Sequence, residues 1–201
     1  MVKKPSASPS LLLGCGGIFI EAGYEEVIVP AIWEAQTFIA KAGPAITAEM
    51  YTFADKANRA CCLVPEITGL VQEQWRASWS KTDKKPSRLF YVARCYRYER
   101  PQAGRYREFT QVGVELLGGK RPDDRREVED LLVQLLDDVG VEYEIDRQVR
   151  RGLSYYTEDG FEALCPGLGA QKQIAGGGRY AEGIGWAIGL DRLLLATEAA
   201  R

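Results

Sequence analysis

The centre of the chain contains two long segments, rich in apolar residues, whose composition is typical of β-strands. Residues 89–98 read LFYVARCYRY and residues 108–117 read EFTQVGVELL, and both contain several β-branched or aromatic residues. The segment between them, ERPQAGRYR, includes Arg100, Arg105 and Arg107. We therefore expect two strands joined by a long loop that is dense in arginine.

Two segments nearer the C-terminus have helical spacing of apolar residues. In residues 121–138, Val128, Leu131, Leu132 and Leu135 fall on one face of a predicted amphipathic helix. The final segment, IGWAIGLDRLLLATEAA, predicts a strand that leads into a helix. The glycine cluster AGGGRY at residues 175–180 is interpreted, on its composition alone, as a flexible turn.

Short strands, helices and turns are predicted over the rest of the chain. Residues 1–10 are polar and rich in Pro and Ser, and a short helix that ends at Ala22-Gly23 follows them. The further predicted strands are Glu25 to Pro30, Tyr51 to Phe53, Ala60 to Val64, Val141 to Ile145 and the segment FEALCP at residues 161–166. The further predicted helices are Ile32 to Lys41, ended by Gly43, and Leu70 to Trp79, with a charged loop from Trp79 to Arg88. Because there are no regular βαβ units, this succession predicts the α+β class with a central, mostly antiparallel sheet.

Composition narrows the chemistry that the chain can perform. Its 201 residues carry 26 Lys and Arg against 28 Asp and Glu, and the net charge of −2 disfavours a strongly basic nucleic-acid binder. Histidine is absent, which excludes a Ser-His-Asp triad, a Cys-His dyad and a histidine-ligated metal. The five cysteines form no CxxC pair and are expected to be reduced and buried. The longest apolar runs are too short to cross a bilayer, so we expect a cytoplasmic protein.

Charged residues gather where the two central strands meet the arginine-rich loop. On an extended chain Arg97 and Glu99 share one face, and Gln111 and Glu115 share one face of the second strand. A concave sheet face that presents Arg97 and Arg105 could clamp a polyphosphate, because Arg binds phosphate through a bidentate fork. From charge alone, a solvated surface hairpin is the alternative.

Several motifs occur in an order that resembles a known family of enzymes. They are VPEITG at residues 64–69, RYERPQAGRYREFTQ at 97–111, RGLSYY at 151–156, AGGGRY at 175–180 and GLDRLLL at 189–195. Together they resemble the catalytic core of class II aminoacyl-tRNA synthetases, most closely that of histidyl-tRNA synthetases. The segment from Tyr24 to Pro30 is similar to the family's dimer-forming first motif. The resemblance covers residues 18–201 after a short N-terminal segment, residues 1–17, and implies a catalytic domain whose mixed, mainly antiparallel sheet is flanked by helices.

The resemblance also implies a role for each matching residue. Arg97 would hold the α-phosphate of ATP and the substrate carboxylate in line, and Arg151 would supply positive charge at the reacting phosphorus. For the rest of ATP, the implied residues are Glu99 for adenine, Arg105 for the γ-phosphate, and Phe109 and Arg192 below and above the adenine ring. For the amino acid, they are Glu66, Thr68 and Gln111 for the α-amino group, and Glu115 and Tyr156 for the imidazole, with Tyr155 and Tyr180 beside them.

The implied reaction joins ATP and an amino acid, histidine by preference, into an aminoacyl-adenylate, with Mg²⁺ arriving on ATP and without a side-chain metal cluster. The implied partners are a second copy of the chain and, weakly, tRNA; a carrier or a small molecule is another acceptor. Only 36 positions separate Glu115 from Arg151, which leaves no room for the family's insertion domain, and no anticodon-binding domain is expected after Arg192. Two alternatives stay open: a histidine-binding regulatory paralogue, similar to the regulatory subunit of ATP phosphoribosyltransferase, and a minimal core of a larger synthetase.

Overall fold

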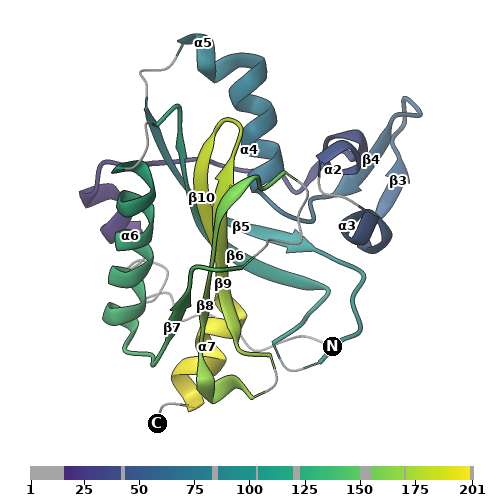
Figure 1. Cartoon of the computed structure of the whole chain (residues 1–201). Coiled ribbons are helices and arrows are strands. Elements are labelled where there is room, and N and C mark those ends of the chain that lie inside the picture. The colour runs from purple at the N-terminus through teal and green to yellow at the C-terminus, as the bar shows by residue number, and fades with distance from the viewer. Residues whose placement is uncertain are drawn as a thin grey trace.

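Two β-sheets of unequal size organise the chain (Figure 1). The computed structural model describes residues 16–41, 44–82, 86–102, 104–119, 123–149, 155–169 and 171–199. The large sheet has the strand order β1-β5-β6-β10-β9-β8-β7, and its pairs are antiparallel except for the parallel pair of β1 and β5. Its strands are β1 (Glu25–Glu26), β5 (Ser87–Tyr96), β6 (Glu108–Leu117), β7 (Glu144–Asp146), β8 (Glu158–Leu164), β9 (Gln173–Tyr180) and β10 (Gly183–Gly189). The predicted α+β class, with a mixed, mainly antiparallel sheet flanked by helices, is confirmed.

The small sheet forms a lobe beside the large one, on the right of Figure 1. Its order is β2 (Ile32–Glu34), β4 (Ala60–Leu63) and β3 (Thr52–Ala54), and α2 (Ala35–Lys41) and α3 (Pro44–Glu49) belong to the same lobe. The prediction of a helix from Ile32 was wrong for its first three residues. They pair with β4 instead, Ile32 opposite Leu63 and Glu34 opposite Cys61, and a partner so distant in sequence leaves no trace in local spacing. Gly43, predicted to end the helix, lies outside the described residues.

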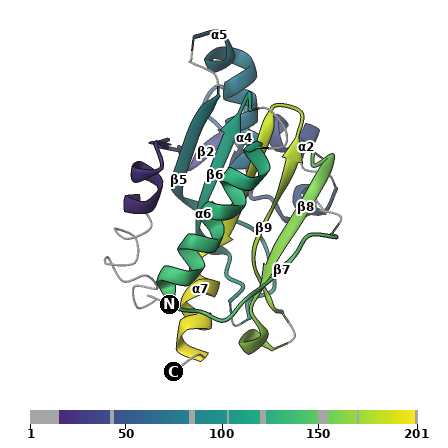
Figure 2. The same cartoon turned by 60° about the vertical axis from the view of Figure 1, so that its left-hand side comes forward.

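Helices α6 (Asp123–Val139) and α7 (Leu190–Ala199) cover one face of the large sheet (Figure 2). The amphipathic face predicted for α6 packs there, since its four predicted apolar residues are all buried against the sheet. The side chains that β6 contributes to this core are those of Val112, Val114 and Leu116. Because side chains alternate along a strand, Gln111, Gly113 and Glu115 must face the opposite side.

The opposite face of the sheet is covered in part by α4 (Thr68–Gln74), which continues into a π-helix, η1 (Trp75–Trp79), and then into α5 (Ser80–Thr82). The predicted helix over residues 70–79 is present but begins at Thr68. The predicted loop over residues 79–88 was wrong at both ends, since it contains α5 and the first residues of β5. A 3₁₀ turn, η2 (Pro166–Leu168), precedes β9.

The glycine cluster at residues 175–180 is a strand, so its interpretation as a turn was wrong. It forms most of β9 and pairs with β10 from Ala175 to Tyr180. A Cβ atom on Gly177 would come within 2.6 Å of the Trp186 Cβ and the Phe161 Cζ. Glycine is therefore required here for close packing and not for chain flexibility.

The remaining predictions differ from the structure mainly at element boundaries. The strand predicted from Glu25 to Pro30 is regular only over Glu25–Glu26, although the Val27 N–H still donates to the Phe90 carbonyl. The strand predicted from Val141 begins at Glu144. Residues 16–21 are helical and Gly23 has a φ of 80°, as the predicted stop at Ala22-Gly23 requires, while residues 1–15 lie outside the described residues. Cys61, Cys62, Cys95 and Cys165 are buried free thiols.

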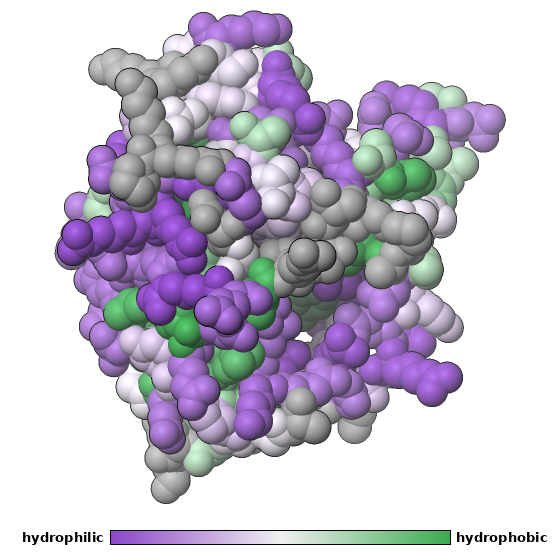
Figure 3. Space-filling view, in the orientation of Figure 1, coloured by the Kyte–Doolittle hydropathy of each residue, from purple (hydrophilic) through white to green (hydrophobic). Residues whose placement is uncertain are grey.

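The surface seen in Figure 3 is mostly hydrophilic, with hydrophobic residues in smaller patches, one of them on the lobe that carries β2, β3 and β4. Within the described part of the chain, no helix has the length and apolar character needed to span a membrane.

Candidate active site

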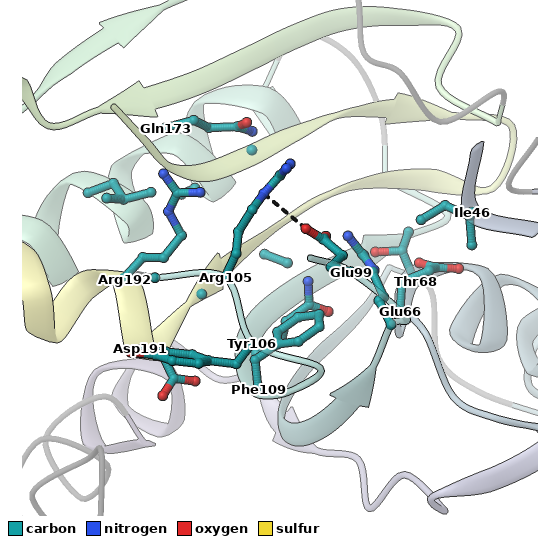
Figure 4. Close-up of a pocket in the computed structure, with 18 of the residues that line it drawn as sticks. Ile46, Glu66, Thr68, Glu99, Arg105, Tyr106, Phe109, Gln173, Asp191 and Arg192 are labelled. Atoms are coloured by element: carbon teal, nitrogen blue, oxygen red, sulfur yellow. Dashed lines mark ion pairs between the residues drawn. The ribbon is translucent and has the colours of Figure 1, made fainter. Parts of the chain in front are cut away.

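A cavity of about 460 Å³ lies on the face of β6 that α6 and α7 leave uncovered (Figure 4). The start of α4, the loop between β5 and β6, the segment before β8, and the first turn of α7 all contribute to its lining. The sequence-predicted site residues that line it are Glu66, Thr68, Arg97, Glu99, Arg105, Phe109, Gln111, Tyr155, Tyr156 and Arg192. Arg151 lies outside the described residues. One cavity thus brings together predicted residues from four of the five motifs, and Ala175 and Gly176 of the fifth line it as well.

Glu115, predicted to read the imidazole together with Tyr156, and Tyr180, predicted to lie beside them, are not among the residues that line the cavity. Glu115 has no solvent exposure, and its carboxylate accepts hydrogen bonds from the hydroxyls of Thr68 at 2.6 Å, Tyr180 at 2.6 Å and Tyr91 at 3.4 Å. Burial raises the pKa of Glu115 to about 8, although the first two hydrogen bonds lower it in part. Glu115 therefore lies directly behind Thr68, which does line the cavity.

Glu66 is folded over the first turn of α4. Its two carboxylate oxygens accept the backbone N–H of Gly69 at 3.0 and 3.1 Å, and one of them accepts the Tyr155 hydroxyl at 3.1 Å. Glu66 is 3% exposed, and burial raises the pKa of its carboxyl, opposed by the Gly69 N–H and by the charge of Arg97. A carboxylate held in this way at the cavity wall is suited to bind an ammonium group. The ammonium would donate a charge-assisted hydrogen bond to the carboxylate and so compensate it for the hydration that it loses on burial.

Three tyrosines form an aromatic wall at the same end of the cavity: Tyr155 and Tyr156 line it, and Tyr180 packs against both. The ring centroids of Tyr155 and Tyr156 are 4.6 Å apart, and Tyr180 lies 6.3 and 6.4 Å from them. Burial raises the pKa of the Tyr155 and Tyr180 hydroxyls well above the usual value, so both remain hydrogen-bond donors at neutral pH. The wall can therefore enclose a small planar polar group.

Arg97 lines the cavity between Pro65 and Phe109, directly after the end of β5. Its Nε donates to the Pro65 carbonyl at 2.8 Å, and its guanidinium carbon is 5.3 Å from the centroid of the Phe109 ring. Gln111, two residues after Phe109 on β6, accepts a hydrogen bond from the Cys95 thiol at 3.2 Å. These contacts fix Arg97 and Gln111 from beneath and leave the remaining guanidinium nitrogens for a ligand.

The other end of the cavity is basic, as Figure 4 shows around Arg105 and Arg192. Arg105 forms an ion pair with Glu99 at 3.0 Å, and Arg192 donates to the side chain and the carbonyl of Gln171. The Nε of Arg192 is buried with no hydrogen-bond partner among the described residues, and burial together with Arg105 lowers its pKa. An unpaired buried donor beside a second arginine favours an anionic ligand at this end.

The sequence analysis missed several cavity residues. Asp191 accepts the backbone N–H of Thr110 at 3.2 Å and so ties α7 to β6 beside Arg192. It lies next to the arginine within the motif GLDRLLL, so the motif itself contained the signal. Tyr106 likewise lies within the motif at residues 97–111, whereas Ile46, Glu49, Glu162 and Gln173 come from segments whose local sequence carries no chemical signature.

The described residues hold no group of three or more His, Cys, Asp or Glu side chains that could bind a metal ion. A cavity with carboxylates and tyrosines at one end, arginines at the other and Arg97 between them can hold an amino acid against a polyphosphate. In that arrangement, a carboxylate and a phosphate would meet beside Arg97, where its positive charge offsets their mutual repulsion.

The chain is similar to known proteins in sequence and in fold. The family model described as histidyl-tRNA synthetase matches residues 15–146. Proteins named histidine–tRNA ligase are similar in sequence: that of Archaeoglobus fulgidus is 30% identical, with 85% of this chain and 67% of the relative aligned, and that of Methanosarcina acetivorans is 29% identical, with 86% and 67% aligned. The chain thus spans about two thirds of the length of these relatives. The Methanosarcina alignment has 278 positions although it includes only 86% of the 201 residues, so the relative contains residues within the aligned region that this chain lacks.

Solved structures share the fold. The apo histidyl-tRNA synthetase of S. aureus superimposes with a TM-score of 0.79 at 24% identity, covering 100% of this chain and 71% of that one. A protein from Bacillus halodurans C, described as an ATP phosphoribosyltransferase regulatory subunit/histidyl-tRNA synthetase, gives 0.77 at 17% identity, covering 98% and 83%. At these sequence identities, the solved structures show only that the fold is shared. Membership of the family is shown by the family model and by the sequence relatives. The chain belongs to the histidyl-tRNA synthetase family.

Proposed function

We propose that the protein activates histidine with ATP. In this reaction a carboxylate oxygen of histidine attacks the α-phosphorus of ATP, the bond to the β-phosphate oxygen breaks, and histidyl-adenylate and pyrophosphate form. The observation that carries the proposal is the single cavity that joins Glu66, Thr68 and Tyr156 at one end to Arg105 and Arg192 at the other, with Arg97 between. No acid–base histidine is needed, because in-line positioning and charge stabilisation supply most of the acceleration.

At the acidic end, Glu66, Thr68 and Gln111 would bind the α-amino group of the amino acid. Glu115 lies immediately behind Thr68, so an imidazole between the tyrosines would reach it by displacing or sharing the hydroxyl that now occupies its carboxylate. A buried polar partner of this kind rejects side chains that cannot pair with it, because the unpaired group would remain desolvated.

At the basic end, the triphosphate of ATP would replace Glu99 as the partner of Arg105, and the adenine would lie between Phe109 and Arg192. Glu99, released from the ion pair, would face the adenine amino group. The proposed Mg²⁺ would be carried by the phosphates, since the described residues hold no acidic cluster, and it would neutralise the charge of the leaving pyrophosphate. Arg151 is proposed to add positive charge at the reacting phosphorus.

The test is ATP–pyrophosphate exchange with each of the twenty amino acids in the presence of Mg²⁺. We expect histidine-dependent exchange, which Arg105→Ala should reduce by about 100-fold or more through the loss of phosphate binding and charge stabilisation. Arg94→Ala is a matched control, because Arg94 also forms an ion pair, with Glu108 at 3.6 Å, but does not line the cavity. Histidine binding without exchange would favour the regulatory paralogue, and the absence of both would contradict the site altogether.

We further propose that the protein is a homodimer and that tRNA, a carrier or a small molecule accepts the activated group. The edge of the large sheet supports the dimer: β1 is an edge strand, and beside it Ile28 and Ile20 are 92% and 63% exposed. An unpaired strand edge with exposed apolar side chains near it favours association with another chain. Light scattering of the purified protein should give twice the chain mass, and Ile28→Glu should shift it towards the monomer.

A further inference from the structure

A buried ion pair lies behind the acidic end of the cavity, on the opposite face of the large sheet. The guanidinium of Arg179 in β9 donates to both carboxylate oxygens of Asp124 in the first turn of α6, each at 2.7 Å. The two side chains are 7% and 2% exposed. A buried pair contributes little net stability compared with apolar side chains of the same volume, because both charges lose their hydration. The pair is therefore better explained by the positions in which it holds the neighbouring segments than by its contribution to stability.

The pair touches three segments, each of which carries part of the amino-acid end of the cavity. Arg179 directly precedes Tyr180, and adjacent side chains on a strand point to opposite faces, so fixing Arg179 fixes the direction from which Tyr180 reaches Glu115. The Arg179 carbonyl accepts the Thr157 N–H at 2.8 Å and its hydroxyl at 3.3 Å, which anchors the segment that carries Tyr155 and Tyr156.

The third segment is the end of β6, which carries Glu115. The chain turns at Gly118-Gly119 directly after this strand, and a Cβ atom on Gly119 would come within 3.0 Å of the Asp124 Cβ. The turn therefore packs against Asp124 without intervening side-chain atoms. Asp124 and Arg179 together join the end of β6, strand β9 and residues 155–157.

We infer that the Arg179–Asp124 pair is a positioning device that sets amino-acid affinity by holding Glu115, Tyr180 and the Tyr155-Tyr156 segment in register. The inference deepens the proposed function and rests on it for its ligand. Arg179 touches no substrate, so its effect must travel through the backbone of Thr157 and Tyr180. Small displacements of Glu115 or of the tyrosines would weaken amino-acid binding, because a hydrogen bond to a buried ring nitrogen tolerates little change in distance or angle.

The variant Arg179→Lys tests the inference, because it keeps the charge and loses the bidentate fork. In ATP–pyrophosphate exchange we expect the KM for histidine to rise by about 10- to 100-fold, while the KM for ATP changes by no more than about twofold. Independently of any ligand, hydrogen exchange of the Thr157 amide should accelerate by about tenfold or more, since its acceptor is the Arg179 carbonyl. Should Arg179→Lys fail to fold, the double variant Asp124→Leu/Arg179→Met removes both charges and leaves neither of them buried alone.

Arg88→Lys is the matched control. Arg88 forms the same kind of fork with Glu127, with contacts of 2.6 and 2.8 Å, and it also connects the sheet to α6, but away from the cavity. We expect it to lower thermal stability without altering the KM for histidine or the exchange of Thr157. Equal increases in both KM values, or identical behaviour of the two variants, would overturn the inference. If the wild-type protein activates no amino acid, the proposed function fails, while unchanged Thr157 protection in Arg179→Lys would separately refute the positioning role.

Discussion

Glu115 is the side chain on which the proposed specificity depends. It has no solvent exposure and is surrounded by the hydroxyls of Thr68, Tyr91 and Tyr180, all placed as donors to its carboxylate. The variant Glu115→Gln keeps the shape but can no longer ionise to a charged acceptor for an imidazole. We expect the KM for histidine to rise by about 10- to 100-fold in pyrophosphate exchange, with the KM for ATP nearly unchanged. Equal losses for the two substrates would mean that Glu115 is structural.

The same carboxyl links stability to pH. Burial raises the pKa of Glu115 from 4.5 to about 8, so between these values the folded protein binds more protons than the unfolded chain. The free energy of unfolding must therefore fall as the pH rises through this window, by up to about 1.4 kcal/mol per pH unit. Glu66 contributes in the same direction, because burial raises its pKa as well.

Urea unfolding across that pH window measures this linkage. Glu115→Gln should flatten the dependence relative to the wild type, and the exposed Glu142→Gln should leave the slope unchanged. A slope that is identical in all three proteins would show that Glu115 keeps an ordinary pKa in the fold.

At the residue scale, the motifs predicted which side chains gather but not how they are held. Ten of the predicted site residues line one cavity, although no periodicity of the sequence relates α4 to the segment before β8. The contacts that fix them could not be predicted, because they come from backbone groups and from residues without chemical signatures. The Pro65 carbonyl that orients Arg97 and the Cys95 thiol that binds Gln111 are examples.

At the scale of elements, local pattern was sufficient where an element contains its own signal. The strand predicted over residues 108–117 has those boundaries, and α6 begins and ends within two residues of its prediction. Pattern failed where a distant partner decides, as for Ile32–Glu34, which pairs with β4, and for the glycines of β9. In both places tertiary contacts override local propensity.

Gly177 offers a direct test of this view of β9. The variant Gly177→Ala places a methyl group within 2.6 Å of Trp186 and Phe161, both fully buried, and should destabilise the protein by about 1–3 kcal/mol. Gly17→Ala is the control, because that glycine lies in the helix of residues 16–21 with nothing within 4 Å of the added Cβ, and it should stabilise by up to about 1 kcal/mol. Thermal unfolding of the two variants compares them, and a flexible turn at Gly177 would instead tolerate alanine.

At the scale of the whole molecule, charge decides how the protein meets a polyanion such as tRNA. Affinity for nucleic acid that does not depend on sequence comes from Lys and Arg that neutralise phosphates, and it falls steeply as salt rises. The net charge of −2 offers little general attraction. Three arginines on the described surface are also engaged, since Arg88 pairs with Glu127, Arg125 with Glu129 and Arg126 with Asp130.

We therefore expect tRNA to bind this chain weakly at physiological salt, with a Kd in the non-specific range of about 10⁻⁴–10⁻⁶ M. Neutralising a partner, as in Asp130→Asn, frees Arg126 and should strengthen binding slightly and steepen its salt dependence. The Kd and its salt dependence can be measured by filter binding over a range of salt concentrations, with wild-type and anticodon-altered tRNA. Any charging of tRNA should accordingly be slow and indifferent to the anticodon. Tight binding that drops when the anticodon is altered would contradict this expectation.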